Sequence, residues 1–254
     1  MHVPACVSSV MSQPDRHQGA ATMPIALTKP LGSLIAALAI MLLAVAPAHA
    51  GTKEQKRAEN ALAVLREVQS TPDNEIPASL LSKSYAIAVI PEVVKIGLVV
   101  GGRRGKGLIS VRQADGTWSN PAYIALTGGS FGFQAGVQSA DIILVFRTPR
   151  GVDNLVAGKF TLGADASVAA GPVGRQASAA TDSGLKAEIL TYARARGLFA
   201  GVALDGSVLS LDYDAIERVY GSGISPRALF EGRVRGAPGF IVDFKDQLEE
   251  QTSN

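Results

Sequence analysis

All three histidines and the single cysteine of this 254-residue chain lie within its first 50 residues: His2, His17, His49 and Cys6. From Gly51 onward the chain contains neither residue type. Ser-His-Asp and Cys-His nucleophiles, Cys/His zinc sites, thiolate-held clusters and His-ligated haem all need one of these side chains. The sequence after residue 50 therefore excludes the commonest catalytic and metal-binding constellations, and we expect no metal and no cofactor.

Two other patterns could do chemistry without histidine. Ser183 and Lys186 have the S-x-x-K spacing of a serine nucleophile and its lysine base, but the companion S-D-N and K-T-G elements are missing. No spacing singles out two aspartates as a catalytic pair, and residues 212–214 lack the further carboxylate and glycine of a calcium loop. We expect a protein that is not an enzyme, because any catalysis would depend on carboxylates, lysine or tyrosine alone.

The best anion-binding candidate is the glycine-rich segment 101–107, which carries Arg103, Arg104 and Lys106. The flanking residues predict strands, so the segment is predicted to be the loop between them. Exposed backbone N–H groups and guanidinium groups both donate to phosphate oxygens. The segment is not a nucleotide P-loop, because no Ser or Thr follows the lysine and its glycines are too close together. Two interpretations stay open: a solvated hairpin tip, or a site for lipid headgroups.

A second candidate is the helix predicted for residues 53–69. Its apolar side chains recur three or four residues apart and so share one face: Ala58, Leu62, Leu65 and Val68. Its cations include Lys53, Lys56 and Arg57. Such a helix either docks on its own domain or lies on a membrane surface with its apolar face in the headgroup boundary. The two interpretations are compatible if the helix can undock.

Residues 1–50 are expected to be removed on export. Lys29 precedes an apolar stretch at 31–45, and the sequence Ala-His-Ala at 48–50 is a small-x-small cleavage pattern. The stretch is shorter than the roughly 20 residues that span a bilayer. Because leaders usually have about 15–30 residues, we expect a signal peptide at 23–50, and an upstream mis-start or a disordered segment at 1–22. Position 51 is glycine, so we expect an exported, periplasmic protein that is not a lipoprotein.

Residues 51–254 are expected to form one domain with a net charge near +1, which is no footprint for nucleic acid. Short β-branched or aromatic runs separated by turn residues predict an antiparallel meander, at 85–90, 93–100, 107–112, 122–126, 131–138 and 141–147. Strands follow at 160–170 and 186–210, with a hairpin across Asp205-Gly206. Helices are predicted at 78–83, 152–159, 213–220 and 225–231, and the tail 239–254 is expected to be peripheral. The fold class is therefore α+β: a curved antiparallel β-sheet closing towards a barrel or sandwich, with an N-terminal amphipathic helix and several short helices.

An ordered series of segments resembles the SYLF domain family. It comprises Ile76-Pro77 with Leu80-Leu81, residues 101–107, 112–121, 128–136 followed by Asp141, 162–165, 170–175, 197–201 with Gly206, and Tyr220-Gly221. The resemblance extends over about residues 54–232. It implies lipid binding without catalysis: eukaryotic members sit in endocytic adaptors and bind phosphoinositide membranes through a basic surface and an N-terminal amphipathic helix, and some bind actin. Bacterial members are exported and consist of the domain alone, so actin binding is not expected here.

We therefore expect non-catalytic, membrane-peripheral binding of anionic phospholipids or other envelope lipids, such as lipopolysaccharide. The resemblance assigns the helix with Lys53, Lys56 and Arg57, and the residues themselves add the glycine-rich segment. The expected lipid-binding residues are Lys53, Lys56, Arg57, Leu62, Leu65, Arg103, Arg104 and Lys106. The rival interpretation is a structural or protein-interaction module of the envelope.

Overall fold

The computed structural model describes residues 51–68, 76–97, 100–131, 136–174, 186–195 and 197–253. The chain divides into two units, Met1–Ala46 and Pro47–Asn254, and every described residue belongs to the second. The expected signal peptide at 23–50, the segment 1–22, and Ser183 of the S-x-x-K pattern lie outside the described residues.

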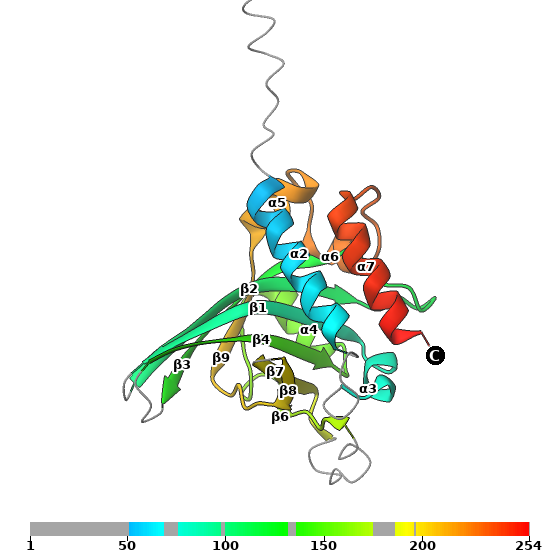
Figure 1. The fold of residues 1–254 in the computed structure, drawn as a ribbon. Helices are drawn as coiled ribbons and strands as arrows, with labels where there is room; N and C mark the ends of the chain where they lie inside the picture. Colours follow the sequence, from blue (N-terminus) through cyan, green and yellow to red (C-terminus); the bar gives the residue numbers. More distant parts are fainter. Residues whose placement is uncertain are drawn as a thin grey trace, which may run out of the picture. The chain divides into compact units, whose positions relative to one another are not determined.

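Along the second unit, helices stand at both ends and the strands lie between them, divided into two runs by α4 (Figure 1). The helices are α2 (Gly51–Glu67), α3 (Ala78–Ser82), α4 (Arg150–Ala157), α5 (Tyr213–Tyr220), α6 (Pro226–Phe230) and α7 (Gly239–Thr252). The strands are β1 (Ala86–Gly97), β2 (Val100–Val111), β3 (Ala122–Phe131), β4 (Gly136–Phe146), β5 (Phe160–Thr161), β6 (Val168–Ala170), β7 (Ile189–Ala195), β8 (Leu198–Gly201) and β9 (Ser207–Leu211).

One curled sheet contains these strands in the order β5-β9-β3-β2-β1-β4-β7-β6, with β8 paired to β7. Every pairing is antiparallel except β6 with β7. The long strands β1 to β4 arch over β7, β8 and β9, while α2 and α7 lie on the outer face (Figure 1). The predicted α+β class with a curved antiparallel sheet is confirmed.

A bulge in β1 contributes to the curl. The pairing of β1 with β2 shifts register between Val89 and Val94, and Glu92 within the bulge has a positive φ of 51°. Opposite the bulge, a Cβ atom added to Gly107 would lie 2.1 Å from the carbonyl oxygen of Val89. Glycine is therefore required there, because only a residue without a side chain lets the two backbones approach so closely.

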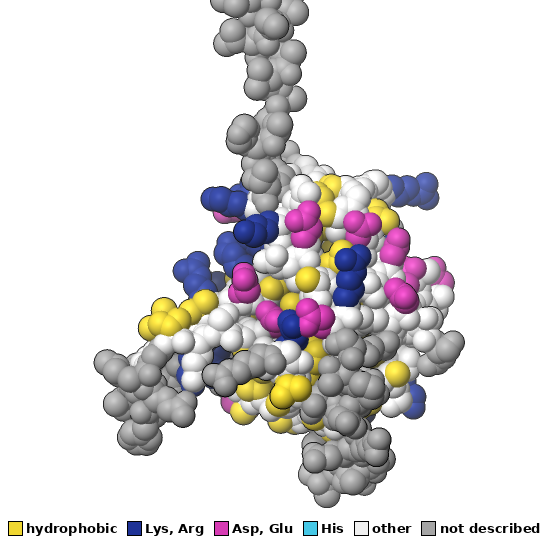
Figure 2. Space-filling view, viewed as in Figure 1, with side chains coloured by type: hydrophobic (Ala, Val, Ile, Leu, Met, Phe, Trp, Pro, Cys, Tyr) yellow, Lys and Arg dark blue, Asp and Glu magenta, His cyan; other side chains and the backbone are white. Residues whose placement is uncertain are grey.

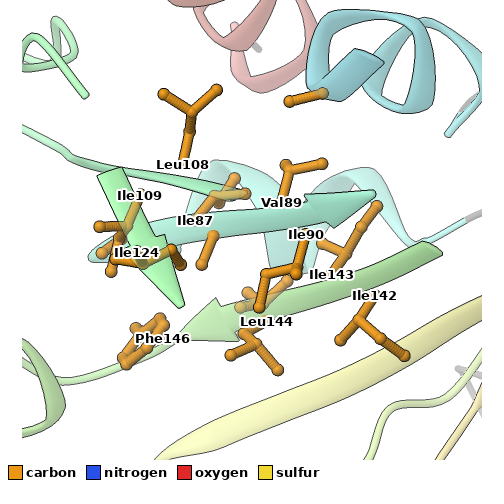
Figure 3. Packing of buried hydrophobic residues seen from close by; sticks show 14 of the residues in the cluster. Ile87, Val89, Ile90, Leu108, Ile109, Ile124, Ile142, Ile143, Leu144 and Phe146 are labelled. Atoms are coloured by element: carbon orange, nitrogen blue, oxygen red, sulfur yellow. The ribbon is translucent and has the colours of Figure 1, made fainter. Parts of the chain in front are cut away.

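The core occupies both faces of the central strands. Val89 and Leu108 point towards α2 and α7, whereas Ile142, Leu144 and Phe146 point to the opposite, concave side (Figure 3). All five side chains are at most 4% exposed. The sheet is thus covered by α2 and α7 on its outer face, and on its concave face by its own curled edges and by α4, whose Gly151 packs against Phe146.

The expectation of a peripheral C-terminal tail is wrong. Helix α7 packs along α2, and its residues Ile241, Phe244 and Leu248 are fully buried. The Nε2 group of Gln251 donates a hydrogen bond to the carbonyl of Leu65, and Trp118 Nε1 donates to Thr252 Oγ1 at 2.9 Å. The acidic composition of the tail concealed a narrow apolar stripe of helical period.

Three strand predictions are also corrected. The hairpin across Asp205-Gly206 does not form: the turn is present, but β8 pairs with β7 and β9 pairs with β3 and β5. The predicted strand 131–138 spans the end of β3 and the start of β4, and 160–170 contains two short strands in place of one. Residues 162–167 turn between β5 and β6, and residues 132–135 lie outside the described residues. The turn at Asp205-Gly206 was recognised correctly, but the partner of each flanking strand depends on residues far away in sequence. The strand prediction within 186–196 is confirmed by β7.

Candidate functional site: a cationic groove between α2 and β2

The segment 101–107 is part of strand β2, so the prediction of a basic glycine-rich loop is wrong. Arg104 pairs with Val94 of β1 on one side and with Thr127 of β3 on the other. The glycines allow close packing of neighbouring strands: a Cβ atom on Gly105 would lie 2.6 Å from a methyl group of Val93, and one on Gly101 would lie 2.2 Å from the carbonyl oxygen of Ile96. The glycine spacing reflects the curl of the sheet.

Because alternate residues of a strand face opposite sides, the three cations of this segment do not form one cluster. Lys106 lies on the outer face, where it contacts Asp212. Arg104, two residues away, shares that face. Arg103 lies on the concave face, where its Nη1 donates to the carbonyl of Ala203 at 3.4 Å. The structure therefore separates Arg103 from the other two.

The outer face carries a groove between the N-terminal half of α2 and the strands β1 and β2. Its volume is about 320 Å³. It is lined by Lys53, Lys56, Arg57, Asn60, Pro91, Glu92 and Lys106. We call it the α2–β2 groove. Four of the eight predicted site residues thus meet in one place, although 53 residues of sequence separate Lys53 from Lys106.

Asp212 holds the two inner cations of the α2–β2 groove. Its Oδ2 atom accepts hydrogen bonds from Lys106 Nζ at 2.8 Å and from Arg57 Nη1 at 3.1 Å. Its Oδ1 atom accepts from the backbone N–H of Ala215 at 3.3 Å and so caps α5. The guanidinium of Arg57 also lies over the ring of Tyr123, 5.1 Å from the centroid. Arg57 is therefore fixed in position, with its side chain only 12% exposed.

The charge balance of the groove is positive. Burial acts to raise the pKa of Asp212, but the hydrogen bonds and charges of Lys106 and Arg57 outweigh it and hold the pKa below its ordinary value of 3.8. Asp212 and Glu92 are the two carboxylates beside four cations. Lys53 and Lys56 are exposed, and neither has a salt-bridge partner within the described part of the chain. Figure 2 shows dark blue side chains gathered along this side of the molecule.

Leu62 and Leu65, predicted to contact lipid, are core residues. They are 7% and 2% exposed and lie on the face of α2 that packs on the sheet and on α7. Of the two interpretations of the helix, the structure shows the docked one. Ion pairs fasten both ends of α2: Glu54, 3% exposed, pairs with Arg218 at 2.7 Å, and Glu67 pairs with Arg194. In this conformation neither leucine is available to a membrane.

Sequence reasoning missed Asp212, Glu92 and Asn60 as parts of the site. The sequence does indicate that Asp212 caps a helix, because an aspartate directly before a helical run is a typical N-cap residue. Its contact with Lys106 could not be predicted from the neighbouring residues. Within the described residues, no group of three or more His, Cys, Asp or Glu is placed to hold a metal, and no helix has the length and apolar character to cross a bilayer.

Comparison with known proteins identifies the family. The model of the family described as "Ysc84: Las17-binding protein actin regulator" matches residues 127–250, from within β3 to the last turn of α7. The chain is also 35% identical over 185 residues to LAS seventeen-binding protein 3 of Saccharomyces cerevisiae, which covers 72% of this chain and 40% of that protein. This chain belongs to the Ysc84, or SYLF, domain family. The resemblance noted from the sequence is confirmed.

Two further relatives of this SYLF chain give the same result. Protein YSC84 of the same yeast is 36% identical over 169 residues, 65% of this chain and 36% of that protein. The human SH3 domain-containing YSC84-like protein 1 is 36% identical over 159 residues, 61% of this chain and 46% of that protein. The chain thus spans less than half of each of these relatives. The family description names Las17 binding and actin regulation, and the name of LAS seventeen-binding protein 3 refers to binding; none of these names refers to a reaction.

Proposed function

We propose that this SYLF domain attaches reversibly to anionic phospholipid surfaces, and that the α2–β2 groove receives the headgroup phosphates. The observation that carries the proposal is the convergence of Lys53, Lys56, Arg57 and Lys106 on one groove. Ammonium and guanidinium groups donate charge-assisted hydrogen bonds to phosphate oxygens. The function is binding without catalysis.

The magnitude of this attraction is modest. A cation near an anionic membrane surface contributes about 1 kcal/mol, so Lys53, Lys56 and Lys106 together contribute about 3 kcal/mol. Asp212 and Glu92 reduce that sum, since both carry negative charge within the same area. Binding of this strength is reversible, and it weakens with salt because the Debye length is only about 10 Å at 0.1 M ionic strength.

Helix α2 stays docked during this attachment. Burying an apolar side chain contributes about 1.5–3 kcal/mol, so Leu62, Val64, Leu65 and Val68 together stabilise the docked helix by about 6–12 kcal/mol. If the helix inserted into lipid, its own apolar side chains would again be buried, but the apolar face of the sheet that it leaves would be exposed to water. We therefore revise the mechanism expected from the sequence: the cations of α2 act from the docked helix, and its leucines hold it in place.

The predicted export signal indicates which membrane surfaces the protein would meet. An exported, periplasmic SYLF domain meets anionic phospholipids and lipopolysaccharide, and both present phosphates. The alternative is a protein partner, which the family description favours because it names Las17 binding and actin regulation. Actin is not expected as a partner of an exported chain.

Sedimentation of the full chain with vesicles tests the proposal. Phosphatidylglycerol vesicles should carry the protein into the pellet, phosphatidylcholine vesicles should not, and added salt should release it. Sedimentation with actin filaments, in parallel, tests the alternative. Binding to actin without binding to phosphatidylglycerol would reject the lipid function, as would vesicle binding that is indifferent to lipid charge and salt.

A further inference from the structure

A second hollow lies on the concave face of the sheet, on the side opposite to the α2–β2 groove. Its volume is about 450 Å³, within the range of about 300–1,000 Å³ typical of small-molecule sites. It is lined by Val93, Lys95, Arg103, Gln138, Ser139, Ala140, Ile142, Ala193, Val202, Ala203 and Leu204. We call it the concave hollow.

The strand register gives the concave hollow a polar end and an apolar end. At one end Lys95 pairs with both Arg103 and Gln138 across neighbouring strands. Towards the middle of the sheet, Val93 pairs with Ala140, and one step further Ile142 pairs with Ala193. Val202, Ala203 and Leu204, in the connection between β8 and β9, also line the hollow, and the carbonyl of Ala203 lies beside Arg103. Cations thus lie at one end and aliphatic side chains at the other.

Arg103 is an incompletely satisfied cation at this polar end. Among the described residues, its side chain makes one hydrogen bond, from Nη1 to the carbonyl of Ala203, which is long at 3.4 Å. Its buried Nε atom has no hydrogen-bond partner within the described part of the chain. Burial lowers the pKa of Arg103 from its ordinary value, and none of the residues that line the hollow is acidic. The side chain of Arg103 is half-buried. A partly desolvated guanidinium without a counter-ion among the described residues is unfavourable, so an anion at this point would be stabilised.

We propose that the concave hollow binds a fatty acid. The carboxylate accepts hydrogen bonds from Arg103 and Lys95, and the hydrocarbon chain packs on Val93, Ile142 and Ala193. The charge and shape of the hollow both select this ligand: an anion alone would leave the aliphatic end empty, and a neutral alkane would leave the guanidinium unpaired. This site does not depend on the α2–β2 groove, because the two lie on opposite faces of the sheet.

Isothermal titration of the full chain with decanoate tests the proposal, with methyl decanoate as the uncharged ligand. Arg103→Gln removes the charge, and Ala140→Leu fills the apolar end. Each change should weaken decanoate binding about tenfold or more, since a hydrogen bond to a charged group and a filled cavity both have effects of that order. Methyl decanoate should bind the unaltered protein weakly, and Arg103→Gln should not weaken it further.

Arg104→Gln is the matched control, because it removes the same charge from the adjacent residue on the other face. It should leave decanoate binding unchanged. Thermal melts of all three variants establish that each is folded. The proposal is rejected if decanoate does not bind the unaltered protein, if Arg103→Gln and Ala140→Leu both bind it normally, or if Arg104→Gln weakens it as much as Arg103→Gln does. Vesicle sedimentation of the Arg103→Gln variant should be normal, so failure of this site and failure of the groove are distinguishable.

Discussion

Neutralising the two exposed lysines of α2 should weaken vesicle binding by an amount that can be calculated. Lys53 and Lys56 line the α2–β2 groove and form no salt bridge with any described residue. Each contributes about 1 kcal/mol near an anionic surface. The double variant Lys53→Gln and Lys56→Gln should therefore lose about 2 kcal/mol, which is about 30-fold in the dissociation constant.

The assay is sedimentation with phosphatidylglycerol vesicles over a range of lipid and salt concentrations. Added salt should narrow the difference between the variant and the unaltered protein, because screening removes the same interaction that the substitutions remove. The fold should be unaffected, because both side chains are exposed.

A matched control separates the groove from net charge. Lys83 and Lys159 are also exposed but lie away from the groove, after α3 and before β5. Replacing both by glutamine changes the net charge equally and should alter vesicle binding several-fold less. If the two double variants lose affinity equally, binding depends on overall charge and the reasoning about the groove is refuted.

Three further predictions concern stability. Leu65→Ala should destabilise the protein by about 2–5 kcal/mol, the usual cost of a cavity at a fully buried leucine, and a smaller shift in urea unfolding would mean that α2 is not docked in solution. Gly107→Ala should cost about 1–3 kcal/mol or more through the contact with Val89. Gly129→Ala, where an added Cβ meets no atom within 4 Å, should be nearly neutral. If both glycine variants lose the same stability, the close contact between Gly107 and Val89 at the bulge is not what requires glycine there. Asp212→Asn should destabilise the protein near neutral pH. Because the folded-state pKa of Asp212 is below 3.8, the stabilisation from its charge is fully present above that value and is lost as the pH falls through the folded-state pKa. The difference between the two unfolding curves should therefore shrink in acid, and a constant difference would show that the charge is not responsible.

Periodicity predicted the helices and much of the sheet because those signals are local. The apolar spacing of Leu62 and Leu65 identified α2, and a Ser-Pro pair at 225–226 marked the start of α6. What periodicity could not supply is the partner of each strand. Asp205-Gly206 specifies a turn, yet β9 pairs with β3, which is about eighty residues earlier in the sequence.

The candidate site shows the same limit. The sequence alone was enough to select the cations of α2 and of segment 101–107 as candidates. The glycines of that segment predicted a loop, whereas in the structure they allow neighbouring strands to pack closely. Because the segment is a strand, Arg103 and Arg104 face opposite sides of the sheet. The residue composition of the segment does not indicate this separation. The role of Asp212 beneath Lys106 depends on the pairing of β3 with β9 and was equally hidden.

We propose that the α2–β2 groove binds anionic membranes while α2 stays docked on α7. Arg66 and Gln247 mark that contact, since Arg66 Nε donates to Gln247 Oε1 at 3.3 Å. A chain with Cys6→Ser, Arg66→Cys and Gln247→Cys, joined by a short bismaleimide, fixes the helix to its neighbour. The joined chain should sediment with phosphatidylglycerol vesicles with the same affinity and salt dependence as the unjoined one. Loss of binding on joining, with recovery in the unjoined chain, would show that the helix must leave the domain and would contradict the account.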